Sequence, residues 1–322
     1  MIFEKNVFQM YRSSLIRRYD EDPAVFYYSH GDFEGLQAED YVFPSAEGQM
    51  LRGSFYFYGA KRTDRLVIFE HGMGAGRRAY LKEIERLARA GHTVLAYDKT
   101  GCADSEGADS RCFSQALSDL DCCIRSLRRY ASYETSRIAV VGHSWGAYAA
   151  LNIGALHPAL THIVSLSGPI SVEALLRQYF PGPLKLYIPS VLAFERACCP
   201  AYADLSAVDS LLRTEAKALI LHSADDPMVK QSLHFDVLRQ AMAGRDSIRF
   251  LLLQGKKHNP NYTARAVAYK DTFSAEHSRA KKKGLLETEA QQLAFQDSFD
   301  FDRMTEQDES VWQEILTFLQ EP

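Results

Sequence analysis

Hydrophobic and polar positions follow two alternating patterns through the middle of the chain. Short, almost uniformly apolar runs such as Leu66–Glu70 and Ile138–Gly142 predict strands that are covered on both faces. The segments between them have apolar residues at helical spacing and predict amphipathic helices. Strand and helix in alternation predict an α/β fold with a doubly wound, mostly parallel sheet. The other predicted strands are Thr93–Tyr97, Ile163–Ser167, Ala218–His222 and Arg249–Leu253, and the predicted helices are Tyr80–Ala90, Gln115–Tyr130, Trp145–Leu156, Gln231–Met242 and Asp308–Leu319.

The chain before this alternation has a different pattern. Asp40–Pro44 and Leu51–Tyr58 are extended, aromatic stretches separated by the turn signal Ala46-Glu47-Gly48, and they predict an antiparallel hairpin. Nearer the N-terminus, apolar positions between Ile2 and Leu15 recur at roughly helical spacing. We expect residues 1–37, which are rich in Tyr and Phe, to form an N-terminal extension of the core.

Two segments are too long to be simple connections. Pro169–Arg213 separates two predicted strands and contains many Leu, Tyr and Phe side chains. Residues 259–306 follow the last predicted strand and include Lys281-Lys282-Lys283, which we expect on a solvated face. We therefore expect an α/β core of residues 38–168 and 214–322, an insertion in it at about 259–306, and a helical cap or lid at 169–213, inserted after the sixth strand.

Composition narrows the classes of function. The 322 residues are 46% hydrophobic and 24% charged, which is typical of a soluble globular protein with a sizeable core. There are 37 Lys and Arg against 41 Asp and Glu, a formal net charge of −4, which disfavours a nucleic-acid partner. No apolar run is long enough for a membrane span, and charges interrupt every turn of the N-terminal stretch, unlike a secretory signal. We expect a cytoplasmic protein.

The six cysteines do not predict a metal centre. They show no Cys-x-x-Cys pair and no Cys/His spacing of the kind that binds zinc, so we expect no metal site. The simplest interpretation is buried thiols in a reducing compartment.

One serine lies between two glycines where a predicted strand meets a helix. The segment Gly142-His143-Ser144-Trp145-Gly146 matches the pattern G-x-S-x-G, which alone is a weak signal. Its position is what a nucleophile elbow requires, because a tight turn there lifts the Ser hydroxyl above the sheet and directs the helix N-terminus at the reacting oxygen. Ser144 is the candidate nucleophile, and a plain turn with Ser144 as helix N-cap is the alternative.

Titratable side chains follow two later strand ends. Asp225 and Asp226 come directly after the strand Ala218–His222, and His258 follows Arg249–Leu253 and a glycine turn. Loops at the carboxyl ends of strands are where active sites of open α/β sheets gather. Ser144, an aspartate and His258 also follow one of the chain orders known for serine triads. The alternatives are turn roles for the aspartates and a surface position for the histidine.

A glycine-rich loop follows the first long apolar strand. In Glu70-His71-Gly72-Met73-Gly74-Ala75-Gly76 the spacing G-x-G-x-x-G fails at Arg77 and no G-K-[ST] follows, which excludes both nucleotide-binding motifs. The loop is instead placed to stabilise an oxyanion, with backbone N–H donors from Met73 and from Trp145, the residue after the serine. A tight turn that only needs glycine is the alternative.

These motifs resemble those of the α/β-hydrolase superfamily, and more narrowly its serine aminopeptidase/monoacylglycerol lipase-like branch. The resemblance rests on GHSWG, on the His71–Gly74 loop and on Tyr97–Gly107, and it covers roughly residues 38–258 and the final helix. Lys99, Thr100 and Ala103 depart from the branch pattern D-x-R-G-x-G-x-S-x-G. The acid loop is similar to the family's G-x-x-D-x-x-V, with Ser223 in place of the glycine, and this match selects Asp226.

The resemblance implies a triad of Ser144, His258 and Asp226 that needs no metal and no organic cofactor. Ser144 would attack a carbonyl and form an acyl-enzyme, His258 would move the proton, and Asp226 would orient His258. An apolar cap would favour an acyl or aromatic group in a small-molecule substrate. The expected substrate contacts are His71, His143, Tyr179, Phe180 and Asn259.

We therefore expect a serine hydrolase of the carboxylesterase or lipase type, which cleaves carboxylic esters or thioesters of small to medium apolar acyl substrates. The two glutamates of the cap, Glu173 and Glu195, do not form a cluster that would bind an α-amino group, which favours an esterase over an aminopeptidase. The alternatives are a peptidase or acyltransferase with the same triad, and a catalytically silent hydrolase fold that binds a ligand. The sequence leaves the acyl length, the leaving group and the oligomeric state open.

Overall fold

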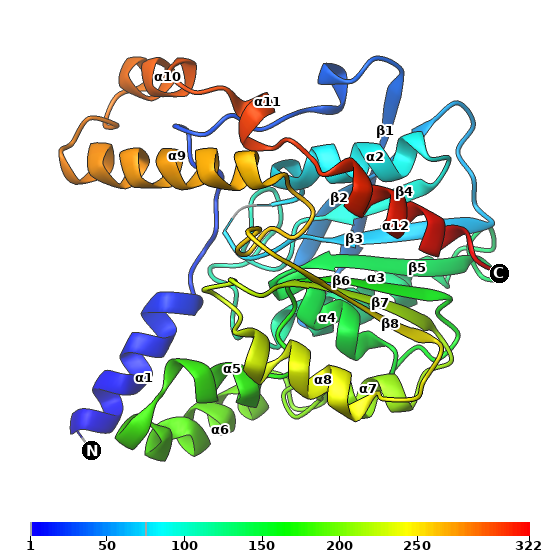
Figure 1. Ribbon diagram of the computed structural model, residues 1–322, viewed down its shortest axis with the longest axis horizontal. Helices are drawn as coiled ribbons and strands as arrows, with labels where there is room; N and C mark the ends of the chain where they lie inside the picture. The colour runs from blue at the N-terminus through cyan, green and yellow to red at the C-terminus, as the bar shows by residue number, and fades with distance from the viewer. Residues whose placement is uncertain (1, 75) are drawn as a thin grey trace.

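A mixed sheet runs through the computed structural model, which describes residues 2–74 and 76–322 (Figure 1). The order of its eight described strands is β1-β2-β4-β3-β5-β6-β7-β8. The hairpin of β1 (Leu36–Pro44) and β2 (Met50–Tyr58) is antiparallel and joins β4 in antiparallel register, while all later pairs are parallel. The predicted fold class is confirmed. The other strands are β3 (Arg65–Glu70), β4 (Thr93–Tyr97), β5 (Arg137–His143), β6 (His162–Leu166), β7 (Lys217–Ser223) and β8 (Ile248–Leu253).

Each central strand contributes side chains to two apolar cores, one on each face of the sheet. In β3, Leu66 and Ile68 belong to one core, while Val67 and Phe69 belong to the other. This alternation is the period of two that a strand imposes, and it explains why the strand sequences are apolar throughout. The first core packs on α3 (Gln115–Leu127), α4 (Trp145–Ile153) and α8 (Phe235–Ala241), and the second on α2 (Leu81–Arg89) and α12 (Glu309–Gln320).

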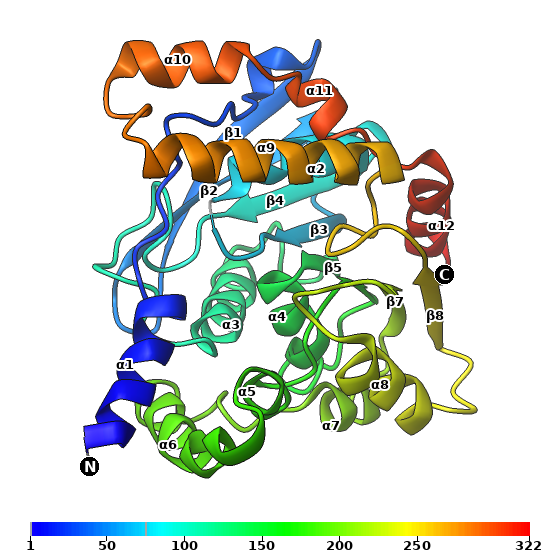
Figure 2. The ribbon, with the colours of Figure 1, turned by 60° about the vertical axis from the view of Figure 1, so that its left-hand side comes forward.

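The segment between β6 and β7, here called the cap segment (residues 169–213), is helical. It forms α5 (Val172–Tyr179), the short helix η3 (Gly182–Tyr187), α6 (Ile188–Cys198) and α7 (Ala207–Leu212). The N-terminal helix α1 (Ile2–Leu15) lies beside η3 and α6 (Figure 2). Phe8 and Phe194 pack edge to face with ring centres 5.0 Å apart, and Tyr11 donates a hydrogen bond to buried Glu195. The N-terminal helix therefore packs on the cap segment.

Residues 259–306, here called the helical arm, form α9 (Ala264–Lys282), α10 (Glu289–Asp297) and α11 (Phe301–Met304). In Figures 1 and 2 the arm lies at one edge of the molecule, against the N-terminal residues that precede β1. Phe273 of α9 packs edge to face on Phe301 with ring centres 5.7 Å apart, and the Gln296 amide donates to the Pro23 oxygen at 2.9 Å. Lys281, Lys282 and Lys283 at the end of α9 are exposed.

All five predicted helices differ from the observed ones at their ends. Those expected at Tyr80–Ala90, Gln115–Tyr130 and Trp145–Leu156 are observed as α2, α3 and α4, each shorter at one or both ends. The other two differences have a visible cause. The expected helix Gln231–Met242 is divided at His234 into η4 (Gln231–Leu233) and α8, because His234 has φ −127° and ψ −69°, outside the helical region. The final helix begins one residue later than expected, since the Asp308 side chain caps it by accepting from the Ser310 N–H at 3.0 Å. Within the described residues, no helix is both long and apolar enough to cross a membrane.

Candidate active site

Ser144 occupies the turn between β5 and α4 in a strained conformation. Its φ of 54° and ψ of −114° lie outside the regions that residues with a side chain normally adopt. The Ser144 N–H donates to the Leu166 oxygen at 2.8 Å, and the Tyr148 N–H donates to the Ser144 oxygen at 3.0 Å, so hydrogen bonds hold the turn on both sides. An N-cap serine would have extended backbone and accept from the first turn, and Ser144 does neither. The geometry is that of a nucleophile elbow.

The two glycines that flank the elbow are required by close backbone contacts. A Cβ at Gly142 would lie 2.4 Å from the Gly146 oxygen, and a Cβ at Gly146 would lie 2.1 Å from the Glu70 oxygen. Both distances are far below van der Waals contact, so a side chain at either position would push α4 away from β5 and β3. The G-x-S-x-G spacing thus sets how closely the helix approaches the sheet.

His258 connects Ser144 to an aspartate. Its Nε2 lies 2.7 Å from the Ser144 Oγ, and its Nδ1 lies 2.8 Å from the Asp226 Oδ2. The other carboxylate oxygen of Asp226 accepts from the N–H groups of Met228 at 2.8 Å and Val229 at 3.0 Å. The structure therefore brings together three side chains from three loops: Ser144 after β5, His258 after β8 and Asp226 after β7. His258 lies between the other two.

The neighbouring aspartate has a different position. Asp225 accepts from the Ser223 hydroxyl at 2.5 Å and from the Lys257 N–H at 3.3 Å, so it ties the acid loop to the loop that carries His258. The residues alone did not decide which of the two aspartates is the candidate acid. In the structure, Asp226 is the one that contacts the imidazole of His258.

The electrostatics of the acid loop favour an ionised Asp226. Burial raises the pKa of its carboxyl, but the hydrogen bond and charge of His258 and the two backbone N–H donors outweigh that effect, and the pKa lies below its usual range. An ionised Asp226 fixes the proton of His258 on Nδ1 and leaves Nε2 free to accept from Ser144. Behind this pair, buried His222 donates from Nε2 to the Val229 oxygen at 2.9 Å.

A second histidine holds the main chain of His258. Burial lowers the pKa of His143 to about 3, and the neighbouring charge of His258 adds to the effect, so His143 is neutral. Its Nε2 lies 2.7 Å from the His258 oxygen and its Nδ1 lies 2.8 Å from the Tyr80 hydroxyl. A neutral ring has one donor and one acceptor, so His143 donates to His258 and accepts from Tyr80. No sequence motif singled out Tyr80.

The loop after β3 passes directly over the serine. A Cβ at Gly72 would lie 3.3 Å from the Ser144 Cβ and 2.5 Å from the Tyr80 hydroxyl, and Met73 lines the same cavity as Ser144. Trp145 is the first residue of α4, where a backbone N–H has no acceptor within the helix. Trp145 therefore lies at the elbow and Met73 in the loop that passes over it, while Ala75 of this loop is outside the described residues.

Beneath this loop lies a buried ion pair. The Lys99 Nζ is 2.9 Å from the Glu70 Oε2 and donates to the His71 oxygen at 2.8 Å, and both side chains are fully buried. Lys99 is one of the residues that depart from the branch pattern, and its role in this structure is to support the loop that carries Met73.

Two of the expected substrate contacts need correction. His71 is 1% exposed, and its ring is held between the Lys99 N–H at 3.1 Å and the Gly72 oxygen at 2.7 Å, so it supports the loop from below. Phe180 is 2% exposed because it ends α5 facing the apolar core. Neither is among the described residues that line the cavity at Ser144.

The cavity at Ser144 is small and apolar, with a volume of about 160 Å³. His143 and Tyr179 line it as expected, whereas Asn259 lines a neighbouring cavity. Of its described lining residues, none is an aspartate, glutamate, lysine or arginine. They are Leu15, Met73, Tyr80, Phe113, His143, Ser144, Trp145, Pro169, Leu175, Tyr179, Met228, Val229 and His258.

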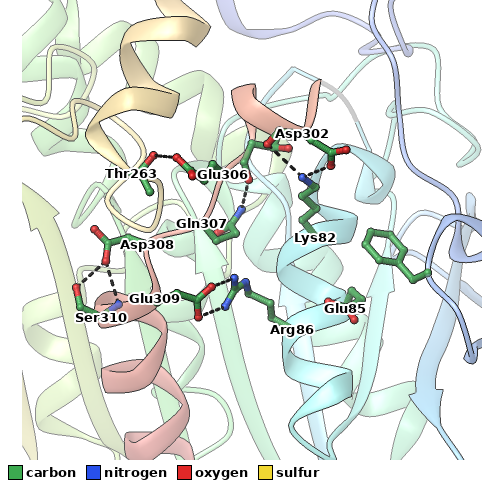
Figure 3. A pocket seen from close by; sticks show the side chains of 12 residues that line it. Lys82, Glu85, Arg86, Thr263, Asp302, Glu306, Gln307, Asp308, Glu309 and Ser310 are labelled. Atoms are coloured by element: carbon green, nitrogen blue, oxygen red, sulfur yellow. Dashed lines mark hydrogen bonds and ion pairs between the residues drawn. The ribbon is translucent and has the colours of Figure 1, made fainter. Parts of the chain in front are cut away.

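A larger cleft of about 530 Å³ lies elsewhere, beside α2 and the start of α12 (Figure 3). Two ion pairs lie within its lining: Lys82 lies 2.6 Å from Asp302, and Arg86 pairs with Glu309. Its other carboxylates pair with cations outside the lining. It shares no described lining residue with the cavity at Ser144. Across the described part of the chain, no group of three His, Cys, Asp or Glu side chains is arranged to hold a metal ion.

Comparison with known proteins agrees with this geometry. Residues 61–255 match the model of the serine aminopeptidase S33 family. The chain is 32% identical over 232 residues to the esterase YjfP of Escherichia coli, an alignment that covers 66% of this chain and 88% of that protein. It is structurally similar to the Pyrococcus furiosus esterase Pf2001, with a TM-score of 0.59 and 18% identity, covering 83% of this chain and 98% of that one. A second similar structure, the α/β hydrolase GrgF of a Penicillium species, has a TM-score of 0.51 and 17% identity, covering 69% and 91%.

Proposed function

Because the chain belongs to the serine aminopeptidase S33 family of α/β hydrolases, we propose that it is a serine esterase that acts through an acyl-enzyme. Its substrates in this proposal are carboxylic esters or thioesters of small to medium apolar acyl groups. The observation that carries the proposal is the continuous hydrogen-bond chain from Asp226 through His258 to Ser144, which ends at a strained elbow.

The reaction follows from these contacts. Ser144 Oγ attacks the ester carbonyl while His258 Nε2 takes the hydroxyl proton, and Asp226 stabilises the imidazolium that results. The backbone N–H groups of Trp145 and Met73 stabilise the oxyanion. His258 then gives its proton to the leaving alcohol or thiol, which leaves Ser144 acylated. In the second half, His258 deprotonates a water molecule that attacks the acyl carbonyl. The acyl–Oγ bond then breaks, His258 returns the proton to the Ser144 Oγ, and the acid is released.

An esterase is supported over an aminopeptidase by the charges near the cavity. An aminopeptidase needs a carboxylate to bind the substrate's α-amino group, and the described lining contains none. The glutamates of the cap segment are engaged elsewhere: Glu195 accepts from Ser114 at 2.7 Å, and Glu173 pairs with Arg177 at 2.6 Å. The matched relative from Escherichia coli is also named an esterase.

Hydrolysis of matched esters and anilides tests this proposal. We expect p-nitrophenyl esters of short acyl groups to be cleaved faster than long-chain ones, because the cavity at Ser144 has only about 160 Å³. We expect aminoacyl-anilides to be poor substrates, and Ser144→Ala to abolish ester cleavage while the protein stays folded. Rapid anilide cleavage with negligible ester cleavage, or full ester activity in Ser144→Ala, would contradict the proposal.

A further inference from the structure

A second cavity of about 270 Å³ lies beside the one that contains Ser144. The two cavities share Met73 and Tyr80 in their walls. Tyr80 also holds His143, and Met73 is a proposed oxyanion donor, so the wall between the two cavities is formed by residues that support the proposed catalytic site. A ligand that passes these two side chains would reach both spaces.

Most of the second cavity is built by segments outside the family match of residues 61–255. Residues 25–28 of the N-terminal extension form one wall, and the helical arm forms another. The two segments hold each other in place: the Tyr28 hydroxyl donates to the Asp302 Oδ1 at 2.8 Å, and the rings of Phe26 and Phe301 have centres 5.8 Å apart. The cavity is therefore a feature of this chain's own extensions.

The walls combine aromatic rings with cationic side chains. The two ionic groups among the described lining residues are Arg78 and Lys270, and no aspartate or glutamate lines the cavity. By contrast, the cleft beside α2 has acidic residues in its lining, and so does the cavity beside Asp22. The aromatic residues of the lining are Phe26, Tyr27, Tyr28, Tyr80, Tyr262, Phe273 and Phe301.

Of the two cations, Lys270 is the one without a counterion. Arg78 pairs with Glu21 at 2.8 Å. The Lys270 Nζ donates to the Asn259 Oδ1 at 3.3 Å and lies 5.1 Å from the centre of the Tyr262 ring, but no carboxylate oxygen of the described residues lies within 4.0 Å of it. Burial lowers the pKa of Lys270, while the more distant charges of Glu83 and Asp271 oppose that effect. A partly buried ammonium is stabilised when an anion binds beside it.

We propose, on the basis of the esterase function above, that the natural substrate is an ester or thioester that carries a carboxylate on an apolar or aromatic group, and that Lys270 binds this carboxylate in the second cavity. The ester carbonyl then lies at Ser144, and the chain between the two groups passes Met73 and Tyr80. The aromatic walls provide the contact surface for the body of the substrate.

Two matched pairs of substrates test the proposal. In the first pair the charge is on the leaving group: the acetate ester of para-hydroxyphenylpropionate and that of its carboxamide. In the second pair it is on the acyl group: the p-nitrophenyl ester of para-carboxyphenylacetic acid and that of its carboxamide. In one of the pairs we expect the carboxylate to be preferred about tenfold in kcat/KM at neutral pH, the effect of one hydrogen bond between charged groups. This preference should come from a lower KM for the carboxylate substrate, with a similar kcat for the two members of the pair.

Variants of the lysine connect the preference to the site. Lys270→Met should reduce the ratio of carboxylate to carboxamide to about one, and Lys270→Arg should retain it, because both groups donate to a carboxylate. Lys282→Met is the matched control, since it removes the same charge from an exposed position on the same helix and should keep the ratio. Circular dichroism verifies that each variant is folded.

The outcomes separate this proposal from the one on which it rests. Cleavage of neutral esters that depends on Ser144, together with no carboxylate preference in either pair, would overturn the role of Lys270 and leave the esterase function standing. A carboxylate preference that is unchanged in Lys270→Met would also overturn the role of Lys270 and leave the esterase function standing. Failure to cleave any ester would overturn both proposals.

Discussion

The Nε2 atom of His143 lies 2.7 Å from the main-chain oxygen of His258, so the residue before the proposed nucleophile holds the backbone of the proposed base. Since His143 is neutral and buried, water competes little for this hydrogen bond. It fixes the loop after β8 at the distance from the elbow that the Ser144–His258 contact requires. His143 is a positioning residue in this account, since it acts through His258.

Removal of that hydrogen bond should lower kcat more than it changes KM. We expect His143→Ala to reduce kcat for a neutral p-nitrophenyl ester by about tenfold, the effect of one lost buried hydrogen bond. His143→Gln, whose amide can still donate to the His258 oxygen, should recover part of the loss. Steady-state kinetics on both variants provide the measurement. Equal loss in the two variants, or a change confined to KM, would argue against a positioning role.

The two adjacent aspartates provide a matched pair. Asp226→Asn should lower kcat by a factor on the order of 10³ to 10⁴, because the amide no longer fixes the tautomer of His258. Asp225→Asn should have less than about a tenfold effect, since it weakens a loop contact and leaves the charge beside the imidazole in place. The comparison uses kcat at one pH for both variants. A larger loss in Asp225→Asn would mean that the acid is wrongly assigned.

A methyl group at one glycine should disrupt the elbow. Gly146→Ala places a Cβ 2.1 Å from the Glu70 oxygen, so α4 or β3 has to move. We expect the free energy of unfolding to fall by about 1–3 kcal/mol and ester cleavage to be lost, because overpacking displaces Ser144. Gly31→Ala is the control: its Cβ would meet the Ser29 hydroxyl at 3.5 Å, an ordinary contact. Urea unfolding measures the stability of both variants, and equal free energies of unfolding for Gly146→Ala and Gly31→Ala would contradict the prediction.

Protonation of a buried histidine should make stability depend on pH. Burial lowers the pKa of His162 to about 4 in the folded protein, while an unfolded histidine titrates near about 6.5. The unfolded chain therefore binds the extra proton first as the pH falls, and this residue weakens folding from about pH 6.5 downward. Wild type should lose about 2 kcal/mol more of its free energy of unfolding between about pH 7 and about pH 5 than His162→Gln, which cannot titrate.

The control for this prediction is Ile163→Val, which removes one methylene from the next residue of the same strand. It lowers stability without a change in titration, so its loss should be the same at both pH values. Parallel pH dependence in wild type and His162→Gln would show that this histidine titrates alike in the folded and unfolded chain.

The sheet and the three loop residues could be predicted because their signals are local. An apolar run such as Ile138–Gly142 has few alternatives to a buried strand, and the G-x-S-x-G turn fixes its own geometry through Gly142 and Gly146. Strand order in the chain then places Asp226 and His258 at the same edge as Ser144.

The remaining parts of the site depend on contacts between distant segments. Tyr80 lies in a stretch without a motif and reaches His143 across 63 positions of sequence. Proximity to a motif did not predict which way a side chain faces, so His71 and Phe180 were expected in the cavity and lie in the interior instead. The second cavity needs residues 25–28 of the N-terminal extension and the helical arm together, and no motif in either of them indicates a binding site.

The central claim, that Ser144 is an activated nucleophile, is tested most directly by the site of covalent labelling. The folded wild-type protein should react with a fluorophosphonate probe, and mass spectrometry of the digested protein should find the adduct on Ser144. Ser144→Ala, folded to the same extent, should not be labelled. An unlabelled wild type, an adduct on another residue, or equal labelling of Ser144→Ala would contradict the account.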